Sequence, residues 1–129
     1  MSYKSFEEMP VWKKAMDLAN KIYHLTEKLP KKEDYGFTSQ IRRSALSISG
    51  NIAEGFGRKH TKDKLNFYYD ARGSLCETKS HLIYGQGIGY FTKDEFNNNY
   101  TLIEEIWREL NFLIASLRGD SQPQPQPQP

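Results

Sequence analysis

Apolar side chains recur every three or four positions in four separate segments of this chain, which is the spacing of one face of an α-helix. The clearest segment follows Thr92, because Thr92-Lys93-Asp94-Glu95 has the form of a helix capping box. Its apolar positions are Phe96, Tyr100, Ile103, Trp107, Leu110, Ile114 and Leu117. No segment alternates apolar and polar residues in the manner of a β-strand. Four such helices joined by short connections predict an all-α fold, an antiparallel up-down-up-down four-helix bundle.

Prolines, glycines and threonines mark where the other three helices begin and end. Pro10 suits the first position of a helix, and Pro30 closes this first segment. The second helix begins at about Thr38 and stops by Gly57. The third has Thr61 as a candidate N-cap and loosens at a glycine-rich end.

The chain ends in a biased segment that does not belong to the bundle. Residues 122–129 repeat Gln-Pro four times. The segment has no large apolar side chain to bury in a core, and a proline at every second position prevents a helix. The simpler interpretation is a solvated extended tail, and the alternative is a docking ligand for an aromatic groove. We therefore assign residues 1–119 to the four-helix bundle domain and residues 120–129 to a disordered Gln-Pro tail.

The composition is typical of a folded cytoplasmic protein. Hydrophobic residues make up 37% of the 129 residues, which is enough for one core. No run approaches the roughly 18 apolar residues that cross a bilayer, and the N-terminus lacks the apolar segment of a signal peptide. A single cysteine, Cys76, excludes an internal disulfide and a cysteine-built metal cage. We expect a cytoplasmic location and no contact with membranes.

Patterns that carry catalysis or bind metals are poorly represented. Cys76 and His81 are five positions apart, so they do not share a helical face. Glu77 and His81 do share one, and together with Glu54 they define the alternative of a metalloenzyme. Di-iron bundles, however, use two Glu-x-x-His motifs and two further glutamates, whereas this chain has one Glu-x-x-x-His. We expect no catalytic residue, no metal and no cofactor.

Charged and amide side chains in the two middle helices are better explained as structural. Glu54 and Glu77, with Arg58 and Arg72, are expected to form inter-helix ion pairs and hydrogen bonds that fix the register of the helices. We therefore predict a structural polar network of Asn51, Glu54, Arg72 and Glu77.

The basic residues are the strongest polar feature. Residues 1–64 contain 13 Lys and Arg against 8 Asp and Glu, whereas residues 65–129 contain 5 against 8. Any anion-binding surface therefore belongs to the first half of the chain. The predicted nucleic-acid contacts flank the second helix, at Arg42, Arg43, Arg58, Lys59, Lys62 and Lys64.

The cations at the two ends of this helix need different explanations. Those near its C-terminus are favoured by the helix dipole, so they need no ligand. Arg42 and Arg43 lie near the N-terminus, where the dipole is unfavourable, and therefore need partners. Those partners are either carboxylates of the same assembly or phosphates of a nucleic acid, and the sequence leaves both open.

Two features indicate contacts beyond a single four-helix core. The apolar stripe of the first helix is wider than the roughly 100° that an isolated bundle needs, which suggests a neighbouring subunit. The second helix contains many small residues, including Gly50 in its middle, which permit close approach of another helix.

Four segments together resemble a known family. They are VWKKA at 11–15, TSQIRRSA at 38–45, SISGNIAEGFGR at 47–58 and ARGSLCE at 71–77. In this order and spacing the chain resembles, over residues 4–118, the bacterial 23S rRNA intervening-sequence proteins (S23-like), whose relatives include the accessory variability proteins of diversity-generating retroelements.

The resemblance implies an antiparallel four-helix bundle that assembles as a homopentameric ring, which would repeat a small basic patch around the ring. The retroelement branch partners a reverse transcriptase and binds nucleic acid. We therefore expect a non-enzymatic, oligomeric protein that binds structured RNA or other nucleic acid. The alternative is a protein-protein adaptor, such as a reverse-transcriptase accessory protein.

Overall fold

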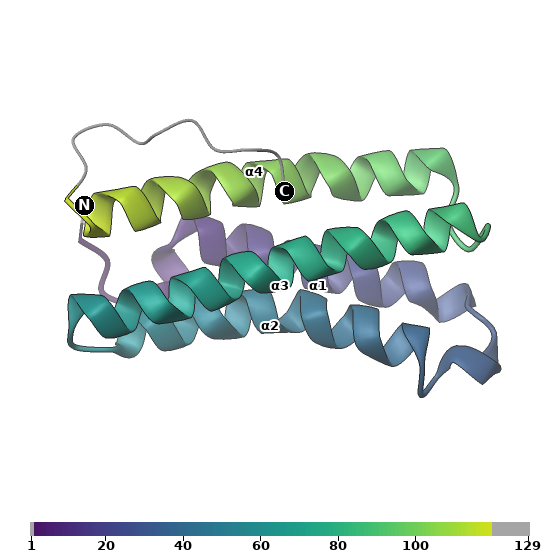
Figure 1. The fold of residues 1–129 in the computed structure, drawn as a ribbon, viewed down its shortest axis with the longest axis horizontal. Coiled ribbons are helices and arrows are strands. Elements are labelled where there is room, and N and C mark those ends of the chain that lie inside the picture. Colours follow the sequence, from purple (N-terminus) through teal and green to yellow (C-terminus); the bar gives the residue numbers. More distant parts are fainter. Residues whose placement is uncertain (1, 120–129) are drawn as a thin grey trace.

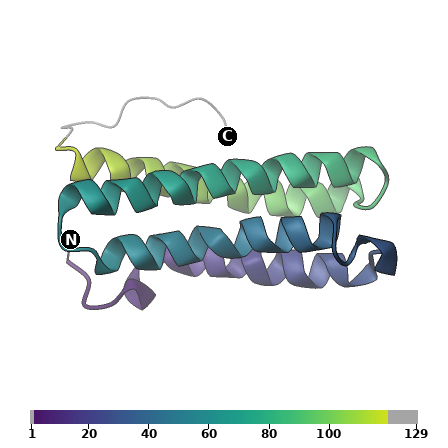
Figure 2. The same cartoon turned by 60° about the horizontal axis from the view of Figure 1, so that its bottom comes forward.

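Four long helices lie along a common axis in the computed structural model, which describes residues 2–119, and each runs antiparallel to the next one in the chain (Figures 1 and 2). The elements are η1 (Phe6–Glu8), α1 (Pro10–Leu25), η2 (Thr26–Lys28), η3 (Lys31–Glu33), α2 (Phe37–Gly57), α3 (Thr61–Gly87) and α4 (Lys93–Leu117), where η marks a 3-10 helix. Helices α1 and α3 each pack against both α2 and α4. The predicted all-α four-helix bundle is confirmed, and the predicted Gln-Pro tail lies outside the described residues.

The helix ends follow local hydrogen bonding. The Thr92 hydroxyl accepts from the Glu95 amide at 3.1 Å and the Glu95 carboxylate accepts from the Thr92 amide at 2.9 Å, so the predicted capping box is confirmed. The Thr61 cap is wrong, because His60 occupies the N-cap position and Thr61 is the first helical residue. Helix α1 ends at Leu25, five residues before Pro30, because the chain tightens there into η2.

Helix α3 extends to Gly87, and its end depends on close packing at Gly85. A Cβ atom at Gly85 would lie 2.3 Å from the ring of Phe91, which is only 3% exposed. The loosened end predicted from the glycines is therefore a regular helix against which Phe91 packs. The turn to α4 follows at Gly89, whose φ of +86° favours glycine.

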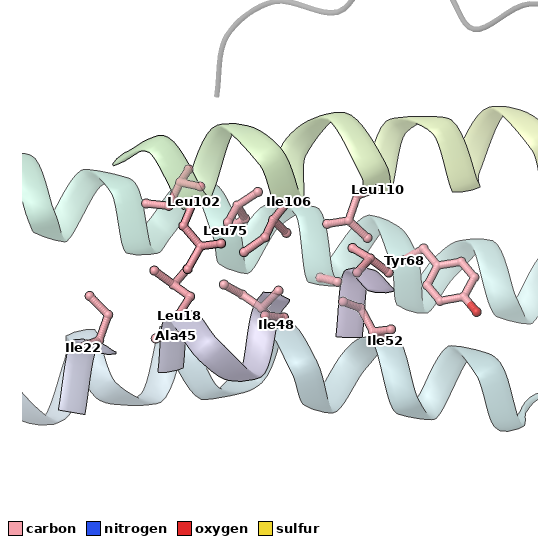
Figure 3. Close-up of a cluster of buried hydrophobic side chains, with 14 of the residues drawn as sticks. Leu18, Ile22, Ala45, Ile48, Ile52, Tyr68, Leu75, Leu102, Ile106 and Leu110 are labelled. Carbon is pink, nitrogen blue, oxygen red and sulfur yellow. The ribbon is translucent and has the colours of Figure 1, made fainter. Parts of the chain in front are cut away.

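The core is one cluster of mostly aliphatic side chains that extends along the bundle axis (Figure 3). Its largest fully buried members are Leu18, Ile22, Ile41, Ile48, Ile52, Leu75, Leu82, Ile103, Ile106 and Leu110. Tyr68 closes one end, and its burial raises the pKa of the phenol to about 12. Within residues 2–119 no helix has the length and apolarity to cross a membrane.

Part of the wide apolar face of α1 packs against other residues of the same chain. Trp12 makes an edge-to-face contact with Phe6 at 5.1 Å between ring centroids. Tyr23 is half-exposed and lies under the guanidinium of Arg42, 4.3 Å from the ring centroid. These contacts cover some of the face that the sequence assigned to a neighbouring subunit.

Candidate nucleic-acid interface

The predicted basic residues form two clusters at opposite ends of α2. Arg42 and Arg43 lie in its second turn, and Arg58 follows its last residue. Arg58 lies sixteen positions after Arg42 along α2, a distance of about 24 Å at 1.5 Å per residue. The two clusters are therefore separate sites within one chain.

Arg42 is held by the end of α1. Its Nε donates to the Thr26 hydroxyl at 2.8 Å, and its Nη2 donates to the carbonyl of Tyr23 at 3.3 Å. The guanidinium also lies over the Tyr23 ring. Carbonyls at a helix end lack intrahelical donors, so Arg42 satisfies one of them and joins α1 to α2. Its partners are a hydroxyl and a carbonyl, which neither of the two predicted alternatives included.

Arg43 pairs with a carboxylate on the next helix. Its Nη2 lies 3.2 Å from Oε2 of Glu77, and 65% of the Arg43 side chain is exposed. Glu77 also lies 3.4 Å from Nε2 of His81, one turn further along α3. Within one chain, Arg43 therefore has a carboxylate partner, which is the first of the two predicted alternatives. An ion pair this exposed is weak, so Arg43 can exchange Glu77 for another anion.

Arg58 and Lys64 hold the turn between α2 and α3. Arg58 pairs with Glu54 at 2.9 Å within one helical turn and lies 4.7 Å from the Phe67 ring centroid. Lys64 Nζ donates to the carbonyls of Gly55 at 3.3 Å and Phe56 at 2.7 Å, at the C-terminus of α2. A cation at this end of a helix is favoured by the dipole and by the unpaired carbonyls.

Lys59 and Lys62 are the two cations of this turn that remain unneutralised. Both are exposed, and within residues 2–119 neither forms a salt bridge or a side-chain hydrogen bond. Residues 58–64 contain four Lys and Arg and one acidic residue, Asp63. The α2–α3 turn therefore presents free positive charge on a backbone that Lys64 fixes.

The predicted polar network is divided into separate contacts, which corrects the expectation of one connected set. Asn51 Nδ2 donates to the carbonyl of Ser47 at 2.9 Å within α2. Arg72 donates to Asn111 on α4 at 2.7 Å and lies 5.3 Å from the Tyr69 ring centroid and 5.7 Å from that of Trp107. Glu54 and Glu77 have the arginine partners described above. Of these contacts, those of Arg72 and Glu77 join helices, and those of Asn51 and Glu54 stay within α2.

The polar contacts that connect α2 to α3 through the interior are hydroxyl pairs. The Thr78 hydroxyl donates to Ser44 at 2.9 Å, and the Ser47 hydroxyl donates to Ser74 at 2.7 Å. The sequence signal was available, because serines and threonines recur at three- and four-residue spacing in both helices. The same residues also predict close packing through their small size, and spacing alone does not identify which hydroxyls form pairs.

The residues of the metalloenzyme alternative do not converge. Glu77 and His81 are neighbours on α3, whereas Glu54 pairs with Arg58 at the other end of α2. In the part of the chain that is described, no group of three or more His, Cys, Asp or Glu side chains is placed to hold a metal ion. Cys76 is a partly buried free thiol on α3.

A groove of about 790 Å³ lies between α1 and α4, and its lining includes the polar residues Asp17, Lys21, His24, Glu95 and Thr101. Its charges are of both signs. Lys28 Nζ lies 2.6 Å from Oε1 of Glu95, and the hydrogen bond from Lys28 lowers the pKa of the Glu95 carboxyl. A groove of mixed charge does not favour phosphate, so the α2–α3 turn remains the stronger candidate for an anionic polymer.

Comparison with known proteins agrees with the bundle described above. The model of the 23S rRNA-intervening sequence protein family matches residues 7–112. A crystal structure of a protein of unknown function from the S23 ribosomal protein family of Bacteroides thetaiotaomicron superposes with a TM-score of 0.73 at 24% identity, covering 81% of this chain and 97% of that chain. At this identity the superposition establishes the fold alone. No curated protein matches the chain.

Proposed function

The chain belongs to the 23S rRNA-intervening sequence protein family, and from this membership we propose that it is a non-enzymatic bacterial protein that binds structured RNA. The proposed assembly is a homopentameric ring in the cytoplasm, and the proposed contact is the α2–α3 turn of each subunit. Recognition is of phosphates and of RNA shape rather than of bases.

One observation carries the proposal: Lys59 and Lys62 are exposed and unneutralised on a turn whose backbone is fixed. The ordering of that turn is already provided by Lys64 and Arg58, so binding phosphate there requires the ordering of only two lysine side chains. Arg58 and Arg43 are secondary contacts, because each must first leave a carboxylate. Arg42 is assigned to the protein fold instead.

Repetition around a ring supplies the affinity that one turn lacks. Two or three phosphate contacts give weak binding at physiological salt, whereas several turns acting on one RNA combine their contacts. The net charge of +2 for each chain agrees with this local arrangement, because it is too small for a strongly basic surface spread over the whole protein.

The test is a salt titration of the purified protein with labelled structured RNA and with duplex DNA. We expect the logarithm of affinity to fall linearly with the logarithm of salt concentration. Lys59→Ala with Lys62→Ala removes two phosphate contacts per bound turn and should reduce the slope by about 2 for each turn engaged. Lys13→Ala with Lys93→Ala, which removes the same charge from exposed positions elsewhere, is the matched control.

Two results would overturn RNA binding at this turn. One is a salt-independent affinity, and the other is an equal change in slope for the lysine pair and its control. Tighter binding to duplex DNA than to structured RNA would mean that the turn binds nucleic acid but that its ligand is DNA rather than RNA.

A second candidate function, a protein-protein adaptor, is favoured by a separate apolar groove of about 330 Å³ between the start of α1 and the end of α4. Tyr3, Val11, Phe112 and Leu113 line it, and Phe112 is 65% exposed. Such a groove accepts apolar side chains of a partner, for example a reverse transcriptase. A partner that co-purifies after nuclease treatment, and is lost in Phe112→Ser, would support the adaptor.

A further inference from the structure

The apolar groove between the start of α1 and the end of α4, which we call the Phe112 groove, contains two aromatic rings. Tyr3 and Phe112 both line it, and Phe112 is 65% exposed although its side chain is large and apolar. Its other apolar lining residues are Met9, Pro10, Val11 and Leu113. Proline-rich segments in a polyproline II conformation bind to aromatic-lined grooves. The Phe112 groove therefore offers the kind of surface that a proline-rich segment binds.

The Phe112 groove has no free charge. Among the described residues, Glu109 is the only charged residue that lines it, and Lys14 of α1 pairs with Glu109. Ser116 adds an exposed hydroxyl. A charged segment would find no free counter-charge here, and burying an unpaired charge is unfavourable. The groove therefore favours a segment that is uncharged and forms hydrogen bonds.

The chain itself contains a segment of this composition. Residues 122–129 consist of four glutamines and four prolines in alternation, with no charged residue. A polyproline II helix has three residues per turn, so a proline at every second position places prolines and glutamines on each of its sides. The proline rings match the aromatic and aliphatic side chains of the Phe112 groove. The glutamine amides match the hydroxyl of Ser116 and the carboxylate of Glu109.

The segment is long enough to cover the groove. The α4 residues that line it run from Glu109 to Ser116, which is about 10 Å at 1.5 Å per residue. Ten residues follow Gly119, and in a polyproline II conformation they span up to about 31 Å at 3.1 Å per residue. The end of α4 and the start of α1 lie at the same end of the bundle (Figures 1 and 2). The segment therefore has the length to turn back and follow the whole groove.

The end of α4 turns the chain at the edge of the groove. Gly119 has a φ of +80°, in the left-handed region that favours glycine, and its amide donates to the carbonyl of Ser116 at 3.1 Å. A left-handed residue at this position ends a helix, so the chain leaves the helix axis directly after the last turn of α4. Because Ser116 also lines the Phe112 groove, residues 120–129 are attached at the edge of this groove.

We infer that the Gln-Pro segment of residues 122–129 binds in the Phe112 groove of its own chain. Attachment favours this occupant over a segment of another protein, because a short linker gives a local concentration in the millimolar range. A contact too weak to hold a free peptide is then formed within the chain. The bound segment covers Phe112, so a partner of the adaptor function must displace it. The RNA binding proposed for the α2–α3 turn does not depend on this contact.

The test measures the mobility of the segment by electron paramagnetic resonance. A nitroxide is attached to Gln126→Cys in the full chain, whose native thiol is removed by Cys76→Ala. We expect a slow component in the spectrum, which should be lost in a variant of the same length that carries Pro→Ser at positions 123, 125, 127 and 129. Phe112→Ser should remove it from the side of the groove. Leu46→Ser replaces a comparably exposed apolar residue on α2, and as the matched control it should keep the slow component.

A second measurement needs no label. A free peptide of four Gln-Pro repeats is titrated by calorimetry, up to millimolar concentration, into the unmodified chain and into the Pro→Ser variant. We expect the peptide to bind the unmodified chain several-fold more weakly, because the attached segment competes for the groove.

Three results would overturn the inference. They are a spectrum of the unmodified segment without a slow component, a slow component that survives Pro→Ser or Phe112→Ser, and a peptide that binds both chains equally. The RNA proposal fails separately, because Lys59→Ala with Lys62→Ala should change the salt-dependent affinity for RNA and leave the nitroxide spectrum unchanged.

Discussion

The contact between α2 and α3 is built differently from the contact between α1 and α4. The interior of the first contact is neutral, because Thr78 donates to Ser44 at 2.9 Å and Gly55 lets the Tyr68 ring approach α2. The Arg43–Glu77 ion pair joins the same two helices at their exposed surface. Ion pairs are added at the surface of the second contact, where Lys14 of α1 pairs with Glu109 and Lys28 of the adjoining η2 lies 2.6 Å from Glu95.

This difference separates contacts that depend on shape from contacts that depend on charge. Close packing and buried hydroxyl pairs do not respond to salt, whereas exposed ion pairs are screened and weak. The α2–α3 pair is therefore joined mainly by contacts of shape in its interior, and it carries the proposed basic turn at its end. The α1–α4 pair is the part whose contacts solution conditions can change.

Adding one methyl group at Gly55, in the contact between α2 and α3, should produce the largest change in the free energy of unfolding. A Cβ in Gly55→Ala would lie 2.7 Å from the Tyr68 ring and 3.1 Å from Phe67, so the buried Tyr68 ring, or α3 with it, must shift away from α2. We expect the free energy of unfolding to fall by about 2 kcal/mol, as for other overpacked interiors. Urea unfolding of the variant measures it, and an unchanged midpoint would show that this contact is not tightly packed.

Alkaline solution should weaken the α2–α3 contact through Tyr68. The folded pKa of this phenol is raised to about 12, and an unfolded tyrosine ionises near 10. The unfolded chain therefore loses its proton first, and stability that is complete below pH 10 declines as the pH rises toward 12. Tyr68→Phe should show a smaller decline between these values in thermal unfolding, and an identical decline would assign the effect to other groups.

A substitution at Gly73, on the exposed side of α3, is expected to increase the free energy of unfolding, in contrast to Gly55→Ala. In Gly73→Ala the added Cβ meets nothing within 4 Å, so only helix propensity changes. We expect the protomer to gain about 1 kcal/mol against unfolding. Urea unfolding of dilute protein measures the change, so that any assembly contributes little. A loss of stability would mean that Gly73 has a role inside the protomer.

The sequence predicts the helices better than their polar contacts, because a helix depends on neighbouring residues whereas most polar contacts join residues that are distant in the sequence. Helical periodicity and the Thr92 capping box depend on residues within a few positions, so both could be identified. The partner of Arg42 could not, because Thr26 lies on another helix 16 residues away. The pairing of Glu54 with Arg58 was available from the i,i+4 spacing and was missed because an inter-helix pair was expected.

The sequence places the six basic residues of the candidate site near the two ends of α2, but it does not divide their roles within each end. Only the fold distinguishes Lys64, which caps α2 through Phe56 at 2.7 Å, from Lys59 and Lys62, which are free within the described chain. Which cations are neutralised depends on backbone carbonyls and carboxylates brought together by folding.

The smallest effect is expected from acid on the α1–α4 contact. The hydrogen bond from Lys28 lowers the folded pKa of Glu95, so the unfolded carboxyl takes up a proton at higher pH than the folded one. Its contribution is present above the unfolded pKa, near 4.3, and is lost as the pH falls through the lower folded value. Because the pair is partly exposed, we expect less than about 1 kcal/mol. Lys28→Ala should reduce the acid sensitivity and leave the alkaline decline unchanged. If Lys28→Ala altered both limits equally, the two contacts would not be independent, and the distinction between a contact of shape and a contact of charge would fail.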